Sequence, residues 1–420
     1  MKRRDFLRLA GVTMVASELA AVAGCATPTP SKARVVVVGG GFGGATAAKY
    51  IRMWDPSIDV VLIERDTSFV SCPISNMVLG GYTTVQELTR GYDGLRRHGV
   101  TVVHDEALVI DAAKKTVRLA RGGDMAYERL VVSPGIDFTF GDVQGYEAAM
   151  RNGAVLHAWK AGPQTVALRQ RLEQMRDGGV YILSIPVAPY RCPPGPYERT
   201  SVVASYFKQA KPRAKVLVLD ANPDVTSKGG LFKRAWSELY PGIVEYRGNA
   251  NVVAVEAGAV RTDFDTIKGD VLNVVPAHRA GDIAAKSGLI TTNNRWCDVD
   301  WRTMESKAVK GVHVLGDATL PGPGMPKSAS MANNHAKIAA AAIVQLLNGR
   351  QPAPVKILNT CYSFVAEKEA IRVSSVHEWE AGQGTLVPVK GAGGVSAARS
   401  EAEATYTWNW ARTIWADSFA

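Results

Sequence analysis

The sequence predicts an α/β protein, and three observations lead to that prediction. The run Arg34–Gly44 reads RVVVVGGGFGG, in which four consecutive valines have the pattern of a buried parallel strand. A glycine-rich turn follows at once, and Ala45–Arg52 has the composition of a helix. A second apolar strand, Val60–Ile63, comes next and ends at Glu64. Such strand–helix–strand units build layered α/β domains.

The first turn carries the spacing G-x-G-x-x-G at Gly39, Gly41 and Gly44. In this fingerprint the first glycine makes the tight turn, the second lets a pyrophosphate approach the backbone, and the third packs helix on strand. Glu64 follows twenty residues after Gly44, where a carboxylate can hold ribose hydroxyls. We therefore expect a dinucleotide site here, with Arg65 among its residues. The alternative is a glycine-rich loop in another kind of α/β protein.

Length and charge narrow the class of function. A chain of 420 residues can form two or three domain cores. The net charge is +10, but the basic residues are scattered and are not interleaved with aromatic residues, so nucleic acid is not expected as a partner. The seven histidines show no metal-binding spacing, and no metal site is expected.

Residues 1–30 are expected to be a targeting signal and a spacer. Residues 2–8, KRRDFLR, resemble a twin-arginine signal, and the apolar run after them is too short to span a membrane. This signal predicts export of the folded protein to the periplasm. Residues 22–25, VAGC, also resemble a lipobox, so cleavage near this point and a lipid anchor at Cys25 both stay open.

The next part of the chain is expected to complete the first domain. Gln86–His98 is predicted to be a helix. Four short strands are predicted to form a meander that ends at the turn Ser133-Pro134-Gly135, which faces the ligand. These strands are Val100–His104, Ala107–Asp111, Thr116–Ala120 and Arg129–Ser133.

A second strand–helix–strand unit follows, with a different turn. Its predicted elements are Pro163–Arg176, Gly179–Ile185, Tyr197–Gln209 and Lys215–Asp220. The turn between its first strand and second helix, SIPVAPYRCPPGPYER, has proline where a phosphate-binding turn needs glycine. Proline donates no backbone N–H and its ring blocks close approach. We therefore expect that no second dinucleotide binds there in the usual way.

The chain then returns to the first domain through the strand Val312–Leu315 and the long helix Lys327–Leu347. Asp317, at the end of that strand, suits an acid that binds the polyol chain of a flavin, although an ordinary cap or turn aspartate has the same pattern. From about Gln351 a smaller unit follows. Its aromatic tail, Tyr406–Phe419, is compatible with core packing or with a functional lid.

The predicted fold is therefore two Rossmann-like three-layer domains, one inserted into the other, and a small C-terminal α+β domain. The expected limits are 1–30 for the signal and spacer, 31–155 with 275–350 for the FAD domain, 156–274 for the second domain, and 351–420 for a C-terminal interface domain.

These features resemble the two-dinucleotide-binding-domain flavoproteins of the glutathione-reductase type. Within that group the chain is similar to the flavoprotein subunit of flavocytochrome c sulfide dehydrogenase over nearly the whole mature chain. Three segments carry the similarity: SCPISN with Cys72, YRCPPGPYER with Cys192, and LNTCYS with Cys361. The twin-arginine start fits the same family, and the segment at Cys192 is the most specific element.

The resemblance implies FAD bound covalently through a thioether from Cys72 to the flavin 8α carbon. It implies a redox-active disulfide between Cys192 and Cys361 beside the flavin. It also implies a heterodimer with a c-type cytochrome subunit, whose haem c accepts electrons from the oxidation of sulfide. Pro73 departs from the family pattern, which has a larger residue after the linking cysteine.

The residues themselves leave several alternatives open. Cys192 and Cys361 are 169 positions apart, so their spacing does not show pairing, and a structural disulfide remains an alternative. Cys72 could be an inert buried thiol, and Cys297 is interpreted as a structural thiol. Glu198, at the next helix start, is the candidate proton carrier, although a glutamate in a first helical turn is also favoured by the helix dipole.

Three functions compete. The first is a periplasmic sulfide:cytochrome c oxidoreductase. The second is a related sulfide:quinone oxidoreductase docked at the membrane, although the aromatic tail lacks the basic stripe that favours such docking. The third is a flavin-bearing electron-transfer scaffold without catalytic activity.

Overall fold

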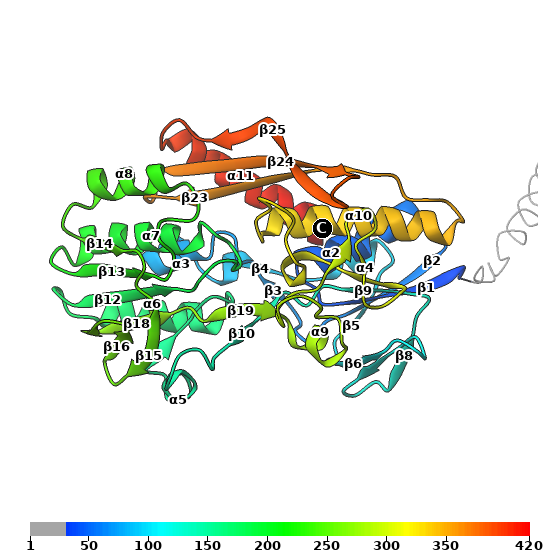
Figure 1. Ribbon diagram of the computed structural model, residues 1–420, viewed down its shortest axis with the longest axis horizontal. Coiled ribbons are helices and arrows are strands. Elements are labelled where there is room, and N and C mark those ends of the chain that lie inside the picture. Colours follow the sequence, from blue (N-terminus) through cyan, green and yellow to red (C-terminus); the bar gives the residue numbers. More distant parts are fainter. Residues whose placement is uncertain (1–30) are drawn as a thin grey trace, which may run out of the picture. The chain divides into compact units, whose positions relative to one another are not determined.

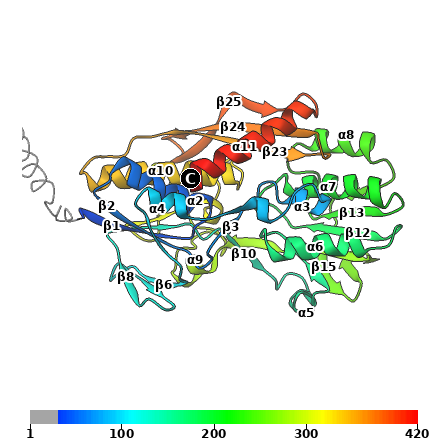
Figure 2. The same ribbon diagram turned by 180° about the vertical axis from the view of Figure 1, so that it is seen from behind.

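The computed structural model describes residues 31–420, so the predicted targeting signal with Cys25 lies outside the described residues. The chain divides into two units, Met1–Lys32 and Ala33–Ala420, and every element below belongs to the second unit. Figures 1 and 2 show this unit from opposite sides. In the part of the chain that the structure describes, no helix has both the length and the apolar character needed to cross a membrane.

The first sheet is built around β1 (Ala33–Val38), in which Val35, Val36 and Val37 are completely buried. This strand pairs in parallel with β2 on one side and with β9 on the other. The full order is β20-β21-β22-β9-β1-β2-β5, in which the β20–β21 and β21–β22 pairings are antiparallel and the others are parallel. The other strands are β2 (Ile58–Ile63), β5 (Thr101–Val103), β9 (Arg129–Val132), β20 (Val299–Asp300), β21 (Glu305–Ser306) and β22 (Val312–Val314).

Two long helices, α2 (Phe42–Trp54) and α10 (Ala329–Leu347), lie side by side on one face of this sheet (Figures 1 and 2). Helix α10 is capped by Ser328, whose hydroxyl oxygen accepts a hydrogen bond of 3.1 Å from the backbone N–H of Met331. Asp317 lies earlier in the chain, in the 3₁₀ turn η2 (Gly316–Ala318), and therefore does not cap this helix.

Two predictions in this domain are wrong. Gln86–His98 is not one helix: it divides into the 3₁₀ turn η1 (Gln86–Leu88), strand β4 (Thr89–Arg90) and helix α4 (Asp93–Arg97), because β4 pairs with β3 (Phe69–Val70). The four predicted strands also do not form one meander. The first and last of them are β5 and β9 of the parallel sheet, and the meander consists of β6 (Ala107–Asp111), β7 (Thr116–Leu119) and β8 (Asp124–Ala126).

The second sheet has five parallel strands in the order β11-β18-β12-β13-β14. Its strands are β11 (Val155–Leu156), β12 (Val180–Ile185), β13 (Lys215–Asp220), β14 (Val244–Arg247) and β18 (Val271–Val274). Its helices are α6 (Pro163–Gln174), α7 (Gly195–Ala210) and α8 (Gly229–Leu239). Prolines at the start of α6 and α7 suit the first helical turn, where no N–H is needed.

Smaller elements connect these layers. Strands β10 and β19 pair as an antiparallel ribbon, and they lie in the two stretches of chain that connect the first sheet with the second. Strands β15, β16 and β17 form a small antiparallel sheet. The bounds are β10 (Ile136–Thr139), β15 (Val252–Glu256), β16 (Ala259–Thr262), β17 (Thr266–Lys268), β19 (Ala277–Ala280), α3 (Asn76–Gly80), α5 (Tyr146–Arg151) and α9 (Asp282–Lys286).

The C-terminal unit is an antiparallel sheet followed by a helix, as the α+β prediction requires. Strands β23 (Lys356–Phe364), β24 (Ala370–Glu380) and β25 (Thr385–Val395) pair in sequence order. Helix α11 (Glu401–Phe419) returns beside α2 (Figure 2).

The aromatic tail lies in α11, and its last part is core packing. The indole N–H of Trp415 donates a 2.9 Å hydrogen bond to Ser71 Oγ, and the Phe419 ring stacks on Phe69 with centroids 5.2 Å apart. Both Trp415 and Phe419 are buried. Trp410, in contrast, is half-buried and lines the cavity described below.

Candidate functional site

A cavity of about 670 Å³ collects side chains from all three parts of the fold. It is lined by the glycine-rich turn after β1, by the proline-rich turn before α7, and by β23. The predicted site residues that line it are Gly39, Gly41, Glu64, Arg65, Cys72, Ser133, Pro134, Gly135, Cys192, Glu198, Asp317 and Cys361. Gly44 is the one predicted residue outside this lining, because it packs against the backbone of Gly39.

The three fingerprint glycines have the local geometry that the motif predicts. Gly39 has φ +96°, and a Cβ there would lie 2.3 Å from the backbone oxygen of Ser133. A Cβ on Gly44 would lie 1.8 Å from the backbone oxygen of Gly39, so Gly44 allows the helix to pack on the turn. Gly41 lines the cavity, and its nearest neighbour would be 3.5 Å away, on Phe69. The turn is therefore open on the side where a phosphate would approach.

Glu64 sits at the end of β2 and lines the cavity. Its Oε2 accepts a 2.6 Å hydrogen bond from Gly40 N–H, and its Oε1 accepts one of 3.0 Å from Asp66 N–H. These bonds hold the carboxylate against the glycine-rich turn. Arg65 also lines the cavity and lies 3.8 Å from the Asp66 carboxylate, with most of its side chain exposed.

Asp317 lines the same cavity and supplies an unpartnered acceptor. Its Oδ1 is buried and has no hydrogen-bond partner within residues 31–420, and burial raises the pKa of Asp317. Buried polar atoms are nearly always satisfied, so a bound hydroxyl donor is expected here. Together with the open glycine turn, this orphaned oxygen fits a flavin dinucleotide: phosphates at Gly39–Gly44 and a polyol chain at Asp317.

Cys72 lies in the loop that joins β3 to α3. It lines the cavity and is half-buried. The backbone oxygen of Cys72 accepts hydrogen bonds from Ser75 N–H at 3.0 Å and from Ser75 Oγ at 2.7 Å. This local turn fixes the position of Cys72 on the cavity wall.

The structure brings Cys192 and Cys361 close together in this lining. Cys192 is half-buried in the turn before α7, where its N–H donates a 2.8 Å bond to Lys327 O. Cys361 is buried in β23. Both residues line the cavity, and a negative charge on Cys361 contributes, after burial, to raising the pKa of Cys192. The structure describes both as free thiols rather than as the disulfide that the resemblance implies.

Glu198 lies beside the cysteine pair in the first turn of α7, as predicted. It is buried, its Oε1 accepts a 2.8 Å bond from Phe364 N–H, and its Oε2 accepts a 2.7 Å bond from Asn76 Nδ2. Burial raises the pKa of Glu198 in spite of these bonds. A helix-dipole role alone does not explain why three separate segments meet at this carboxylate.

Sequence reasoning missed several residues at the site. Asn76 could have been predicted from the sequence, because it lies in the same SCPISN segment as Cys72. Lys228 and Lys327 carry no motif, and only the tertiary structure brings them here. Lys327 is buried over the Trp296 ring, with its Nζ 3.5 Å from the ring centroid, and burial lowers the pKa of Lys327 to about 7.

The second sheet ends in an acid, Asp220, but this carboxylate is fully engaged. Its Oδ2 accepts hydrogen bonds from the hydroxyls of Tyr197 at 2.7 Å and Tyr246 at 2.9 Å. Its Oδ1 accepts bonds from the N–H and the side-chain amide of Asn222 at 2.9 and 2.7 Å. Asp220 is also completely buried.

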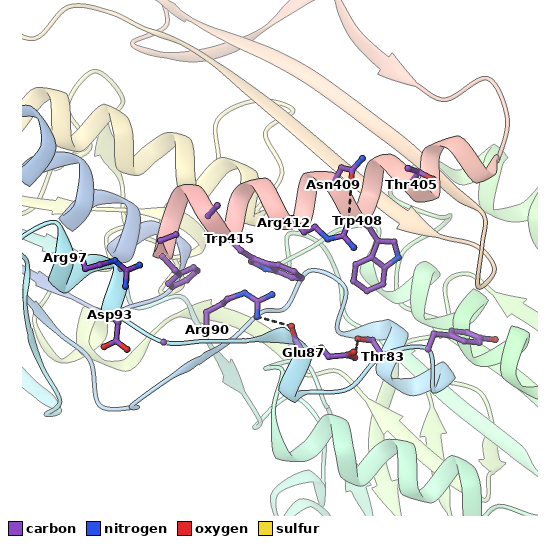
Figure 3. Close-up of a pocket in the computed structure, with 16 residues that line it drawn as sticks. Thr83, Glu87, Arg90, Asp93, Arg97, Thr405, Trp408, Asn409, Arg412 and Trp415 are labelled. Atoms are coloured by element: carbon purple, nitrogen blue, oxygen red, sulfur yellow. Dashed lines mark hydrogen bonds between the residues drawn. The ribbon is translucent and has the colours of Figure 1, made fainter.

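A second cavity, of about 930 Å³, lies between α11 and the segment Tyr82–Arg97 (Figure 3). Arg90 lies over the Trp415 ring at 3.9 Å and donates to Glu87 O at 2.9 Å. None of the predicted site residues lines this cavity.

Cys297 lines neither cavity and is completely buried, and burial raises its pKa to about 12. Over residues 31–420, no group of three His, Cys, Asp or Glu side chains is placed to hold a metal ion.

Comparisons with known proteins give the families that this chain resembles. Residues 165–276 match the family described as "Sulfide dehydrogenase [flavocytochrome c] flavoprotein chain, central", and residues 353–419 match "Flavocytochrome c sulphide dehydrogenase, flavin-binding". Residues 33–171 match "Pyridine nucleotide-disulphide oxidoreductase".

Among individual relatives, the "Sulfide dehydrogenase [flavocytochrome c] flavoprotein chain" of Chlorobaculum thiosulfatiphilum is 69% identical over 45 residues, which are 11% of this chain and 94% of that sequence. The mitochondrial sulfide:quinone oxidoreductase of Dictyostelium discoideum is 23% identical over 68% of this chain, and the match spans 65% of that relative.

The solved sulfide:quinone oxidoreductase structure from Aquifex aeolicus has a similar fold. It superposes with a TM-score of 0.77 at 17% identity, covering 92% of this chain and 91% of that chain. The predicted fold class, with two Rossmann-like domains and a small C-terminal α+β unit, is thereby confirmed. By its matches in the central and flavin-binding regions, the chain belongs to the family of flavoprotein chains of flavocytochrome c sulfide dehydrogenase.

Proposed function

We propose that this protein oxidises hydrosulfide through a redox pair formed by Cys192 and Cys361, with FAD as cofactor and a c-type cytochrome subunit as electron acceptor. The observation that carries the proposal is the shared cavity. Its lining includes both cysteines and Glu198, together with the glycine-rich turn, Cys72 and Asp317, whose Oδ1 has no hydrogen-bond partner among the described residues.

The cofactor proposal assigns each residue a separate task. The turn Gly39–Gly44 holds the phosphates, Glu64 and Arg65 lie at the nucleotide end, and Asp317 accepts a hydroxyl of the polyol chain. Ser133, Pro134 and Gly135 form the opposing turn, and Cys72 provides the thioether to the flavin 8α carbon. When bound, FAD can accept two electrons together and release them one at a time.

The cysteine chemistry begins from the disulfide form of the pair. Hydrosulfide attacks one sulfur, the S–S bond breaks, and its electron pair remains on the other sulfur as a thiolate. The attacked cysteine becomes a persulfide. Glu198, hydrogen-bonded to Asn76 and to Phe364 N–H beside the pair, takes or returns the proton that hydrosulfide and its products exchange.

The proline-rich turn supports precise placement of Cys192. Its four prolines, Pro189, Pro193, Pro194 and Pro196, restrict the backbone without requiring N–H partners. Fixed placement matters because a displacement of about 1 Å at a reacting centre can lower a rate roughly a hundredfold.

A sulfide:quinone oxidoreductase is the second candidate, because the Dictyostelium and Aquifex proteins with that name are similar to this chain. The packing of α11 favours the cytochrome acceptor. At the end of the aromatic tail, Trp415 bonds to Ser71 and Phe419 stacks on Phe69, which leaves Tyr406 as its exposed aromatic residue and reduces the apolar surface that a bilayer could cover. The third candidate, a scaffold without catalysis, predicts no sulfide turnover.

One experiment separates the three. The purified protein is mixed anaerobically with sulfide while flavin absorbance is followed, and an oxidised c-type cytochrome or a short-chain quinone is then added. We expect sulfide to bleach the flavin and the cytochrome to restore it. Restoration by quinone alone supports the second candidate, and unchanged absorbance with sulfide supports the third. Co-purification with a haem protein, seen in the visible spectrum, tests the cytochrome partner.

Export to the periplasm by the twin-arginine route belongs to the same proposal, with either cleavage near Cys25 or lipidation at Cys25. Fractionation of cells that express the full chain, followed by mass measurement of the mature N-terminus, distinguishes the two.

A further inference from the structure

Lys228 is a buried lysine in an unusual backbone conformation. It precedes α8 with φ +57° and ψ 32°, in the left-handed region that glycine adopts at little cost. Gly229 and Gly230 follow it directly, yet the lysine rather than a glycine takes this conformation. Only 7% of Lys228 is exposed. Strained, buried positions of this kind are held by the contacts of the side chain and occur at functional sites.

The hydrogen-bond acceptors of the Lys228 ammonium group are all neutral. Nζ donates to Ser363 Oγ at 2.8 Å, to Cys361 O at 3.2 Å and to Ile371 O at 3.5 Å. Within residues 31–420 no carboxylate lies within ion-pair distance of this nitrogen. A buried charge without a counter-ion is costly, so an anion formed nearby is strongly stabilised by it.

Four titratable groups face Lys228 from the elements packed around it. They are Cys361 on β23, Glu198 on α7, Cys192 in the turn before α7, and Glu403 on α11. Burial lowers the pKa of Lys228 to about 8, and a negative charge on Cys361 is the strongest of the influences that oppose this shift. Lys228 is in turn the strongest influence that opposes the burial-driven rise in the pKa of Cys361.

The positive charge of Lys228 acts more strongly on the pKa of Cys361 than on the pKa of Cys192. For Cys192, Lys228 is the weakest of the five influences on its pKa, and the neighbouring Cys361 and Glu198 both act to raise it. Cys192 is also half-buried, whereas Cys361 is 9% exposed. Cys192 is therefore the less buried residue of the pair, and Cys361 is the residue on which Lys228 acts more strongly.

We propose that Lys228 holds the negative charge at Cys361 when the cysteine pair opens, so that hydrosulfide attacks Cys192 and Cys361 is the leaving sulfur. This assignment rests on the proposed function. A bond forms between hydrosulfide and Cys192 Sγ, the bond from Cys192 Sγ to Cys361 Sγ breaks, and its electron pair stays on Cys361 as the thiolate. The hydrogen of hydrosulfide remains on the terminal persulfide sulfur, and the total charge is unchanged.

The test measures the cysteines directly, without sulfide. The reduced protein is modified with a small thiol reagent, methyl methanethiosulfonate, at pH 7 and pH 9, and peptide mass spectrometry gives the rate at each cysteine. Lys228→Gln removes the charge but keeps a donor for Cys361 O and Ser363 Oγ. Lys233→Gln, at an exposed lysine of the same helix that pairs with Asp224, is the matched control.

In Lys228→Gln we expect the rate at Cys361 at pH 7 to fall about tenfold, because the positive charge that favours its thiolate form is removed. The rate at Cys192 should change by less than about twofold, and Lys233→Gln should match the wild type. An unchanged Cys361 rate in Lys228→Gln, or an equal fall at both cysteines, would overturn the assignment.

Lys228→Arg keeps the test decisive if the glutamine variant does not fold. Arginine stays protonated at both pH values, whereas Lys228 loses its proton near pH 8. Relative to the wild type, the Arg variant should therefore modify Cys361 equally at pH 7 and several-fold faster at pH 9. An equal ratio at both pH values contradicts the assignment. A protein that passes these tests but does not oxidise sulfide contradicts the proposed function alone.

Discussion

The Tyr197 hydroxyl donates a 2.7 Å hydrogen bond to the Asp220 carboxylate at the carboxyl end of β13, where a second nucleotide-binding domain would present an acid to a ribose. Tyr246 and Asn222 occupy the remaining positions around this carboxylate. A ribose would have to displace these buried bonds. The domain therefore keeps the strand–helix–strand plan and uses its acid internally.

We predict that NADH and NADPH do not reduce the protein, because Asp220 is engaged and the turn before α7 is filled with proline. Stopped-flow mixing with either cofactor should leave the flavin absorbance unchanged, while dithionite bleaches it in the same preparation. Rapid bleaching by NADH or NADPH would show that the second domain accepts a nicotinamide cofactor after all.

We predict that FAD is attached through Cys72. After denaturation in acid and filtration, the yellow colour should stay with the protein, and Cys72→Ala should release it into the filtrate while the variant remains folded. Cys297→Ala is the control, because Cys297 lines neither cavity. Free flavin from the wild type would contradict the linkage.

Asp317→Asn should weaken the binding of flavin that is not covalently attached. Measured in the Cys72→Ala background, the dissociation constant should rise about 10- to 100-fold, which corresponds to the roughly 1.5–3 kcal/mol expected for a hydrogen bond to a charged group. Fluorescence titration of the apoprotein with FAD provides the measurement. Equal affinities would mean that the unpartnered Oδ1 does not contact the cofactor.

Glu198→Gln should lower sulfide turnover by about 100-fold or more, in the range found for general acid–base residues. Burial raises the pKa of Glu198, so the carboxylate that accepts a proton forms only above the usual glutamate range of about 4.3. Wild-type activity should therefore fall as the pH drops through this raised pKa, and the variant should lack that acid limb. The exposed Glu173→Gln on α6 is the control, and an identical acid limb in Glu198→Gln would exclude Glu198 as the proton carrier.

The elements that could be predicted are those whose signal is local. The valines of β1 and the glycines at positions 39, 41 and 44 determine a strand, a turn and a helix start within a dozen residues. Gln86–His98 differs from the helix that its local pattern predicts because Thr89–Arg90 pairs with Phe69–Val70, which is distant in sequence. The strands β5 and β9 were assigned to a meander because chain order does not give sheet order.

The site could be predicted where cysteines and acids stand in distinctive segments, and not where tertiary contacts decide. Cys72, Cys192 and Cys361 lie in such segments and line one cavity. Lys228 does not, because a lysine before two glycines has no chemical signature until β23 packs against it. The sequence also does not show that Asp317 Oδ1 lacks a partner. In the structure Ser328, and not Asp317, caps α10, and the buried Asp317 oxygen is left without a hydrogen-bond donor among the described residues.

The central claim is that Cys192 and Cys361 are the redox pair for sulfide, and sulfide-dependent cytochrome reduction by Cys192→Ser and Cys361→Ser tests it most directly. Each variant should lose turnover while retaining attached flavin and a melting temperature close to the wild type. A purely structural bridge predicts the reverse: a loss of stability of about 2–5 kcal/mol, with turnover kept in the folded fraction. Substantial turnover by either variant would contradict the account.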